Sequence, residues 1–222
     1  MYNLKYGNPT YTGYMSGGTG SLSSNRANTI NSTIKGTIDT WYVNNLNANY
    51  GKYLSTTAVY CNSRNLRSGD TYNSSSSFYY VGYERLVTSK TPSYDCEITE
   101  DKFTVDTSTG NGKLTYPIVL MTADEVSYAG GVYSTNAPTW YYYNSIKGSS
   151  TGSTYWWLMS PYNWNSNFAF VFFIYGSNFP GNLVYNGVNS NFGIRPVISI
   201  KGDNLWKSGD GTASSPYEIV TD

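Results

Sequence analysis

The sequence predicts an α+β domain with short mixed and antiparallel strands, two main helices and long irregular loops. Three observations indicate this class: apolar residues at helical spacing in 29–46, a helix-capping pattern at 122–125, and strand-like alternation within 156–200. The helical segments come early and the strands late, which is typical of α+β proteins. The 222 residues suffice for one large core, and no linker divides them, so we expect a single domain over 1–222.

The first predicted helix spans residues 29–46, where apolar positions recur three or four residues apart and so share one helix face. These positions are Ile30, Ile34, Ile38, Trp41 and Tyr42. Asn28 or Thr29 is expected to cap the start of this helix. Residues 1–28, which are rich in Gly, Ser, Thr and Tyr, are expected to be irregular or to form short strands.

The second predicted helix begins at Thr122. Thr122 and Glu125 have the spacing of a capping box, in which each side chain accepts a hydrogen bond from the backbone N–H of the other residue. Gly130 and Gly131 are expected to end this short helix, because glycine readily adopts the left-handed conformation at a helix C-terminus.

Strands and loops are expected in the remaining segments. A strand or extended segment is predicted over 51–60, and strands are predicted over 78–87, 103–105 and 114–121, the last two lying across a turn at 110–112. The polar segments 62–77 and 134–155 are predicted to be loops, and several short strands follow in 156–200.

The charge balance argues against binding to nucleic acid or to an anionic membrane. The net charge is zero, with 14 acidic and 14 basic residues, and charged residues make up 13% of the chain. No stretch approaches the roughly 20 apolar residues of a membrane span, so no membrane insertion is expected. The 24 Tyr residues, with abundant Ser, Asn and Gly, are typical of antibody binding loops, and they suit a loop-rich β-containing protein equally well.

Cys61 and Cys96 are the two cysteines of the chain. A disulfide between them would stabilise the fold by roughly 3–4 kcal/mol and would suit a surface or extracellular protein. Two buried free thiols are the alternative. Because the chain contains no His, a catalytic cysteine would lack its usual base.

The most informative segment runs from Tyr162 to Phe192. It contains eight Asn, six Phe, three Tyr and three Ser, and it contains no Lys, Arg, Asp, Glu, His, Gln, Met, Thr or Cys. An uncharged, aromatic and Asn-rich stretch between well-defined flanks predicts a binding surface.

The flanks and interior of this segment carry a pattern of residues that resembles a known family. The pattern consists of Trp157-Leu158-Met159-Ser160-Pro161, Ala169-x-Val171, Gly181-x-Leu183, Val188 and Gly193-Ile194-Arg195-Pro196-Val197. It resembles the end of bacterial C-type-lectin-fold domains, which share an architecture with formylglycine-generating enzymes. More closely, it resembles the variable protein of a diversity-generating retroelement, with a match of about 45 residues and 157–197 as the variable region.

This resemblance implies a C-type lectin-like fold that displays hypervariable side chains for receptor recognition, without enzymatic activity, cofactor or metal. It implies a cell-surface protein or glycan as ligand, and a location on a phage tail or a bacterial cell surface. Proteins of these assemblies are often oligomers, although no heptad or interface stripe in this chain argues for one.

The genetic code allows a check of the resemblance, because these retroelements misread adenines in their template. Changes to the first two bases of an Asn codon cannot give Lys, Glu, Gln, Met or Trp. Residues 162–192 lack the first four, and the one Trp, Trp164, must then be a fixed position. A plain aromatic β-rich segment would pass this check too.

Alternation along the strand predicts which aromatic residues face outward. Ala169 and Val171 match fixed positions of the family and are expected to face the core, which would place Phe168, Phe170 and Phe172 on the opposite, exposed face. The alternative is that these three Phe side chains form core. The further candidates for the variable surface are Tyr162, Tyr175, Asn178, Phe179, Tyr185, Asn186, Asn189, Asn191 and Phe192, and also Asn163, Asn165 and Asn167, each of which could instead be a turn residue.

Several residues are expected to be structural. Trp157 is predicted to be core, Gly193 to meet a backbone requirement, and Arg195, beside Pro196, to make an ion pair or carbonyl contacts. Asp203 and Asp210 could ligate calcium, but ordinary turns explain them better.

Two other classes of function stay open. A formylglycine-generating activity uses reactive cysteines late in the chain, and here no Cys follows Cys96. A hydrolase activity is also disfavoured, because the chain has no His and no nucleophile motif. A fixed carbohydrate-binding lectin is the main alternative, although the calcium-binding motif of such lectins is absent and Asn178-Phe179-Pro180 does not replace it.

Overall fold

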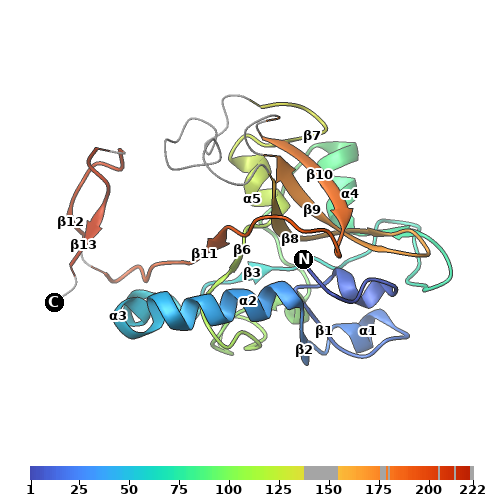
Figure 1. Ribbon diagram of the computed structural model, residues 1–222, viewed down its shortest axis with the longest axis horizontal. Coiled ribbons are helices and arrows are strands. Elements are labelled where there is room, and N and C mark those ends of the chain that lie inside the picture. The colour runs from blue at the N-terminus through green and yellow to red at the C-terminus, as the bar shows by residue number, and fades with distance from the viewer. Residues whose placement is uncertain (138–154, 176–178, 180, 205, 213, 221–222) are drawn as a thin grey trace.

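The computed structural model describes residues 1–137, 155–175, 179, 181–204, 206–212 and 214–220. Helices and strands combine in an α+β arrangement around a five-stranded sheet of order β4–β8–β9–β10–β7 (Figure 1). Its strands are β4 (Phe78–Tyr79), β8 (Tyr155–Trp164), β9 (Ala169–Tyr175), β10 (Asn182–Gly187) and β7 (Val132–Tyr133). All neighbours are antiparallel except β10 and β7, which run parallel. The sequence predicts several short strands in this region, whereas β8 has ten residues and β9 has seven.

The first face of this sheet is covered by the N-terminal half of the chain. Phe173 of β9 and Trp157 of β8 belong to one buried cluster together with Ile34 and Ile38 of α2 (Thr33–Tyr42). Tyr2 packs edge-to-face on Trp157 with ring centroids 5.8 Å apart, so the first residues of the chain complete this face.

The second face packs on a separate buried cluster. Phe172 and Ile174 of β9 meet Val126 of α5 (Ala123–Tyr128) and Leu86 of η4 (Glu84–Ser89), a π-helical continuation of α4 (Val81–Tyr83). Figure 1 shows α4 and α5 beside the sheet and α2 across from them. Because both faces are covered, strand alternation alone does not separate buried from exposed residues in this sheet.

The first predicted helix exists, but it begins later than expected. Ser32, not Asn28 or Thr29, caps α2 by accepting a hydrogen bond from the Lys35 N–H. The cause lies in the preceding residues: Asn28 has a left-handed φ of 52°, and Ile30 pairs with Ser16 as part of β2 (Ile30–Asn31) against β1 (Met15–Ser16). The helix continues through the π-helical η2 (Val43–Asn47) into α3 (Ala48–Tyr50).

The apolar face predicted for this helix is confirmed at three positions and wrong at two. Ile34, Ile38 and Tyr42 are buried, whereas Ile30 and Trp41 are exposed. Ile30 lies outside the helix, which removes it from the periodicity.

The second predicted helix is confirmed in detail. Thr122 and Glu125 form the capping box at the start of α5, with both reciprocal hydrogen bonds present. Gly130 has a φ of 100°, and the Gly131 N–H donates to the Val126 carbonyl over 2.8 Å. The glycine pair therefore ends the helix in the way that its sequence indicates.

The strand predicted over 78–87 is wrong beyond Tyr79. The chain leaves β4 and enters α4 and η4, so Tyr83, Leu86 and Val87 follow Tyr79 at helical spacing and pack on the second face of the sheet. The Tyr79 and Tyr83 rings, four residues apart, lie 4.2 Å from centroid to centroid. The apolar residues of this segment thus follow the helical period, not the strand period.

The other early strands are shorter than predicted and pair differently. The strand or extended segment predicted over 51–60 is confirmed in part: Gly51–Tyr53 forms a short 3-10 helix (η3), Leu54 is extended and forms an isolated bridge with Ile200, and β3 (Tyr60–Cys61) begins at the end of the segment. β5 (Lys102–Phe103) pairs with β3, and β6 (Val119–Leu120) pairs with β11 (Pro196–Val197). Two backbone hydrogen bonds still join 102–104 to 111–114, so the turn exists without the predicted strand pair.

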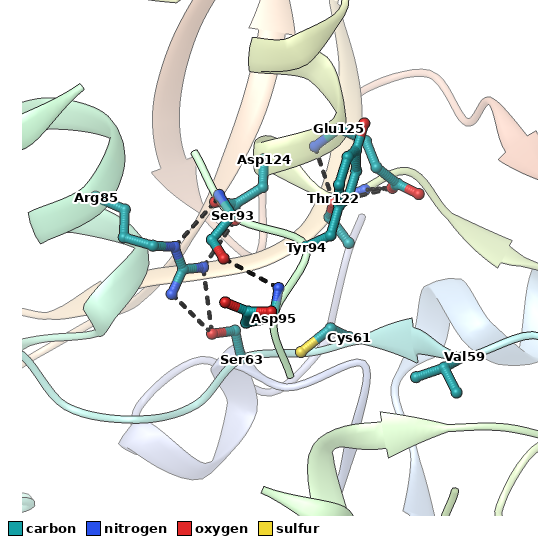
Figure 2. A pocket seen from close by; sticks show the side chains of 10 residues that line it. All are labelled: Val59, Cys61, Ser63, Arg85, Ser93, Tyr94, Asp95, Thr122, Asp124 and Glu125. Atoms are coloured by element: carbon teal, nitrogen blue, oxygen red, sulfur yellow. Dashed lines mark hydrogen bonds and ion pairs between the residues drawn. The ribbon is translucent and has the colours of Figure 1, made fainter. Parts of the chain in front are cut away.

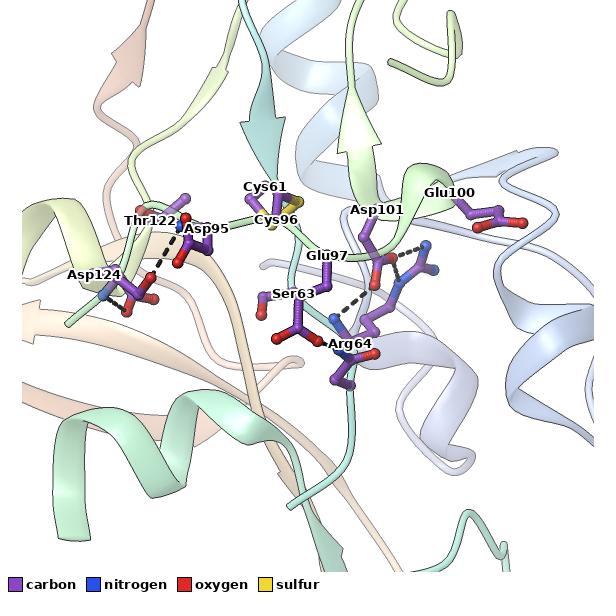
Figure 3. The surroundings of a disulfide bond; sticks show 12 residues. Cys61, Ser63, Arg64, Asp95, Cys96, Glu97, Glu100, Asp101, Thr122 and Asp124 are labelled. Atoms are coloured by element: carbon purple, nitrogen blue, oxygen red, sulfur yellow. Dashed lines mark hydrogen bonds and ion pairs between the residues drawn. A yellow bond between two sulfur atoms is a disulfide. The ribbon is translucent and has the colours of Figure 1, made fainter. Parts of the chain in front are cut away.

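The cysteine pair forms a disulfide, with Cα atoms 5.7 Å apart, which confirms that alternative over two free thiols (Figure 3). Nearby, the buried Asp101 of η5 (Thr99–Asp101) forms an ion pair with Arg64, which is also fully buried. Arg64 Nε donates to Asp101 Oδ1 over 2.7 Å, and Arg64 Nη1 donates to the Met15 carbonyl over 3.0 Å. This buried ion pair, which the sequence did not predict, ties the N-terminal segment to the disulfide-bonded loop.

The remaining described segments are short. Residues 1–28 contain the short strand β1, as predicted, and also a 3-10 turn η1 (Pro9–Thr12) and a one-turn α1 (Leu22–Asn25), which the sequence did not predict. Residues 62–77 form a loop, as predicted. Most of the predicted loop 134–155 lies outside the described residues, and Tyr155 already belongs to β8. A hairpin of β12 (Trp206–Ser208) and β13 (Glu218–Ile219) follows β11 at the end of the chain. Among the helices described, none is long and apolar enough to cross a membrane.

Candidate ligand-binding surface

The predicted variable segment is built on a rigid frame in β8, β9 and β10. Ala169 and Val171 are fully buried on the first face of the sheet, which confirms their expected orientation. Val171 pairs with Pro161 on one side and with Asn186 on the other, so it sits in the middle of the sheet.

The expectation that Phe168, Phe170 and Phe172 form one exposed row is wrong at Phe172. Phe168 is exposed and Phe170 is half-buried, but Phe172 is fully buried against the second cluster. The alternation is as predicted, yet α4 and α5 cover this face over most of its length, so only its end near Phe170 reaches solvent.

At that open end, Tyr162 is the centre of an aromatic stack. Its ring lies parallel to the ring of Tyr185, with centroids 3.8 Å apart and an interplanar angle of 6°. The Tyr133 ring is also nearly parallel to Tyr162, at 8°, and the two hydroxyls are hydrogen-bonded over 3.0 Å. Tyr162 is buried, whereas Tyr185 is 41% exposed. The Tyr185 ring therefore reaches solvent while its inner face packs on the buried Tyr162 ring.

Residues far away in the sequence complete this surface. Tyr79 and Tyr83 meet Tyr162 edge-on, with centroids 5.9 and 5.5 Å away. The Arg67 guanidinium lies over the Tyr79 ring at 4.6 Å and pairs with Asp70 over 3.0 Å. The sequence prediction missed Tyr79, Tyr83 and Tyr133, although the four-residue spacing of the first two was a usable helical signal. We call the set Tyr79, Tyr83, Tyr133, Tyr162, Phe170 and Tyr185 the tyrosine surface.

The phenols of Tyr162 and Tyr133 stay neutral at physiological pH. Burial raises the pKa of Tyr162 well above its usual range, and the hydrogen bond with Tyr133 and the neighbouring phenols raise it further. Burial also raises the pKa of Tyr133. The centre of the surface therefore offers hydroxyls and aromatic rings without charge.

The turn between β8 and β9 lies apart from the tyrosine surface. Asn165 accepts hydrogen bonds from the N–H groups of Asn167 and Phe168, which confirms the turn alternative for this residue. Phe168 stacks on Tyr6, with ring centroids 5.2 Å apart and an interplanar angle of 9°. Asn167 is exposed, while Asn163 is buried.

A further group of predicted residues gathers at the opposite end of the sheet, on its first face. Phe192 packs on Trp157 and Phe173, each at 4.5 Å, and is only half-exposed. Tyr175 lies 5.2 Å from the ring of Phe179, which is 47% exposed.

The Asn residues after β10 differ in their roles. Asn186 accepts hydrogen bonds from the Gly187 N–H and the Ser190 hydroxyl, and Asn191 accepts one from the chain N-terminus over 3.3 Å. Asn189 is half-buried beside Gly187. Asn178 lies outside the described residues. The candidate residues thus do not form one continuous surface, and the tyrosine surface is the one that also gathers aromatic residues from β4, α4 and β7.

The expected scaffold residues hold the frame. Trp157 is fully buried, and its backbone N–H donates to the Gly193 carbonyl over 3.1 Å. Pro196 pairs with Leu120. The Arg195 guanidinium lies 4.2 Å from the Trp156 ring, a cation–π contact that the sequence did not predict.

A polar cavity of about 110 Å³ lies beside the disulfide (Figure 2). Arg85 crosses it to form a bidentate pair with Asp124, at 2.9 and 2.8 Å, and Asp124 also accepts from the Ser93 N–H. Glu125 is occupied by the capping box. These internal contacts use Arg85, Asp124 and Glu125, while Asp95 also lines the cavity.

Metal ligands do not gather in the part of the chain that the structure describes, since no group of three or more His, Cys, Asp or Glu side chains there could hold an ion. Asp210 accepts a hydrogen bond from the Thr212 N–H, the geometry of an ordinary turn, and this contact lowers the pKa of its carboxyl group. No protein-family model matches this chain, and no match was found among curated proteins or solved structures.

Proposed function

We propose that this protein is a ligand-binding display protein of the retroelement-diversified kind, with a C-type lectin-like scaffold. Its exposed aromatic and Asn side chains would recognise a protein or glycan on a cell surface, and it would act on a phage tail or a bacterial surface. The disulfide is compatible with such a location.

One observation carries this proposal: uncharged side chains of the predicted variable segment reach solvent beside buried framework positions. Tyr185 and Phe168 are exposed, whereas Ala169 and Val171 are inaccessible to solvent. A rigid frame that presents Tyr and Asn gives large contact area and adaptable hydrogen bonds at low entropic cost.

A substitution scan for folding tests the proposal. Residues 162–192 would each be replaced by the amino acids that template adenine misreading can produce, and folding would be scored by protease resistance of the displayed protein. We expect Phe168, Phe179 and Tyr185 to accept most replacements, and Phe172 and Val171 to accept few. Equal intolerance at exposed and buried positions would contradict the display function.

A further inference from the structure

The exposed tyrosine of the tyrosine surface is preorganised as a flat platform. Tyr162 covers one face of the Tyr185 ring at 3.8 Å, and Phe170 meets the ring edge-on at 5.6 Å. The 41% of Tyr185 that is exposed therefore lies on its remaining face and edges. Because the ring is already held, a ligand that stacks on it immobilises little additional side chain.

An amide group lies next to this ring. Gly187 follows Tyr185 by two residues and so lies on the same face of the sheet. A Cβ at position 187 would lie 2.9 Å from Asn189 Oδ1 and 4.0 Å from Phe170 Cε1, so glycine is needed here because the Asn189 amide lies directly over its backbone, beside the Phe170 ring. Within the described residues, the Asn189 side chain makes no hydrogen bond, which leaves its donors and acceptor for a ligand.

The charges of this surface decide between classes of ligand. Residues 158–194 contain no charged side chain. The Arg67 cation, which lies over the Tyr79 ring of this surface, is already paired with Asp70 over 3.0 Å. An anionic or cationic ligand would lose water here without gaining an opposite charge, whereas a neutral one would not.

We propose that Tyr185 and Asn189 form a subsite for one ring of a neutral saccharide. The apolar face of the sugar ring packs on Tyr185, and the Asn189 amide, which Gly187 allows to lie close to the sheet, exchanges hydrogen bonds with the sugar hydroxyls. No metal ion takes part. This inference rests on the proposed function and names the ligand class for this site.

The test is an array of defined oligosaccharides, some neutral and some sialylated or sulfated, probed with the full chain in the presence of EDTA. We expect retention on neutral oligosaccharides only. Tyr185→Ala and Asn189→Ala should each weaken binding by about tenfold, the scale of one stacking or hydrogen-bonding contact. Tyr185→Phe should keep binding within about threefold, because the ring remains.

Tyr217→Ala is the matched control, since this Tyr is exposed, at 66%, and packs on Trp206 in the region of the β12–β13 hairpin, which lies away from β10 (Figure 1). It should leave binding unchanged, and the melting temperature of each variant checks its folding. Binding to acidic oligosaccharides alone, binding that EDTA abolishes, or an equal loss in Tyr217→Ala would overturn the proposal.

Retention on no oligosaccharide would also overturn it, but it would leave the display function standing. That function is measured separately by the tolerance of residues 162–192 to substitution, so failure of one proposal does not imply failure of the other.

Discussion

Removal of the Cys61–Cys96 disulfide should lower stability chiefly through the unfolded chain. The bond spans a sequence separation of 35 residues, and the chain-entropy relation for a loop of that size gives about 4 kcal/mol. The native loop would persist, because the Ser93 N–H still donates to Asp124 and the Tyr128 hydroxyl to the Pro92 carbonyl. The closed loop contains β4, α4 and η4, which supply Tyr79 and Tyr83 to the tyrosine surface.

The free energy of unfolding would be measured by urea titration of the wild-type chain and of the Cys61→Ala/Cys96→Ala variant. We expect a loss of about 4 kcal/mol, which corresponds to a lower melting temperature by about 8–16 °C for a domain of this size. Dithiothreitol should destabilise the wild-type chain by the same amount and leave the variant unchanged. A loss below about 1 kcal/mol would refute the reasoning from loop closure.

Three further changes test the account of packing. Arg64→Met leaves Asp101 buried with a weaker partner, so urea titration should show a loss of about 3–5 kcal/mol; a loss under 1 kcal/mol would show that the pair is not buried as described. Phe172→Ala should cost about 3–5 kcal/mol and Phe168→Ala much less, and comparable losses in calorimetry would contradict their different burial. Burial raises the pKa values of Tyr2, Tyr14 and Tyr80, so they stay neutral in the folded chain while the unfolded chain ionises above about pH 10. Their stabilising contribution is complete below that pH and falls by about 1.4 kcal/mol per pH unit for each tyrosine above it. Absorbance at alkaline pH should therefore show these tyrosines ionising only with unfolding, and their free titration near pH 10 in folded protein would disprove their burial.

The sequence was sufficient wherever a local rule determined the structure. The capping box at Thr122 and Glu125 and the glycines after it act within a few residues, and their prediction was confirmed. The burial of Ala169 and Val171 also followed from a local pattern.

Predictions failed where distant segments decided the outcome. Phe172 lies on the side of the strand that was predicted, but α5 and η4 cover that side, and no local signal showed their position. Ile30 has helical spacing with Ile34, yet its backbone pairs with β1. Tyr79 and Tyr83 joined the site because β4 pairs with β8, a contact across more than 80 residues.

We propose that this chain presents a diversified surface on a fixed frame. Sequencing of the gene across a population of its natural carriers, codon by codon over 1–222, tests this proposal most directly. We expect changes confined to 162–192 and to template adenines, concentrated at exposed residues such as Phe168, Phe179 and Tyr185, with Ala169, Val171, Gly193 and Arg195 unchanged. An absence of variation, or variation spread evenly over the chain, would contradict it.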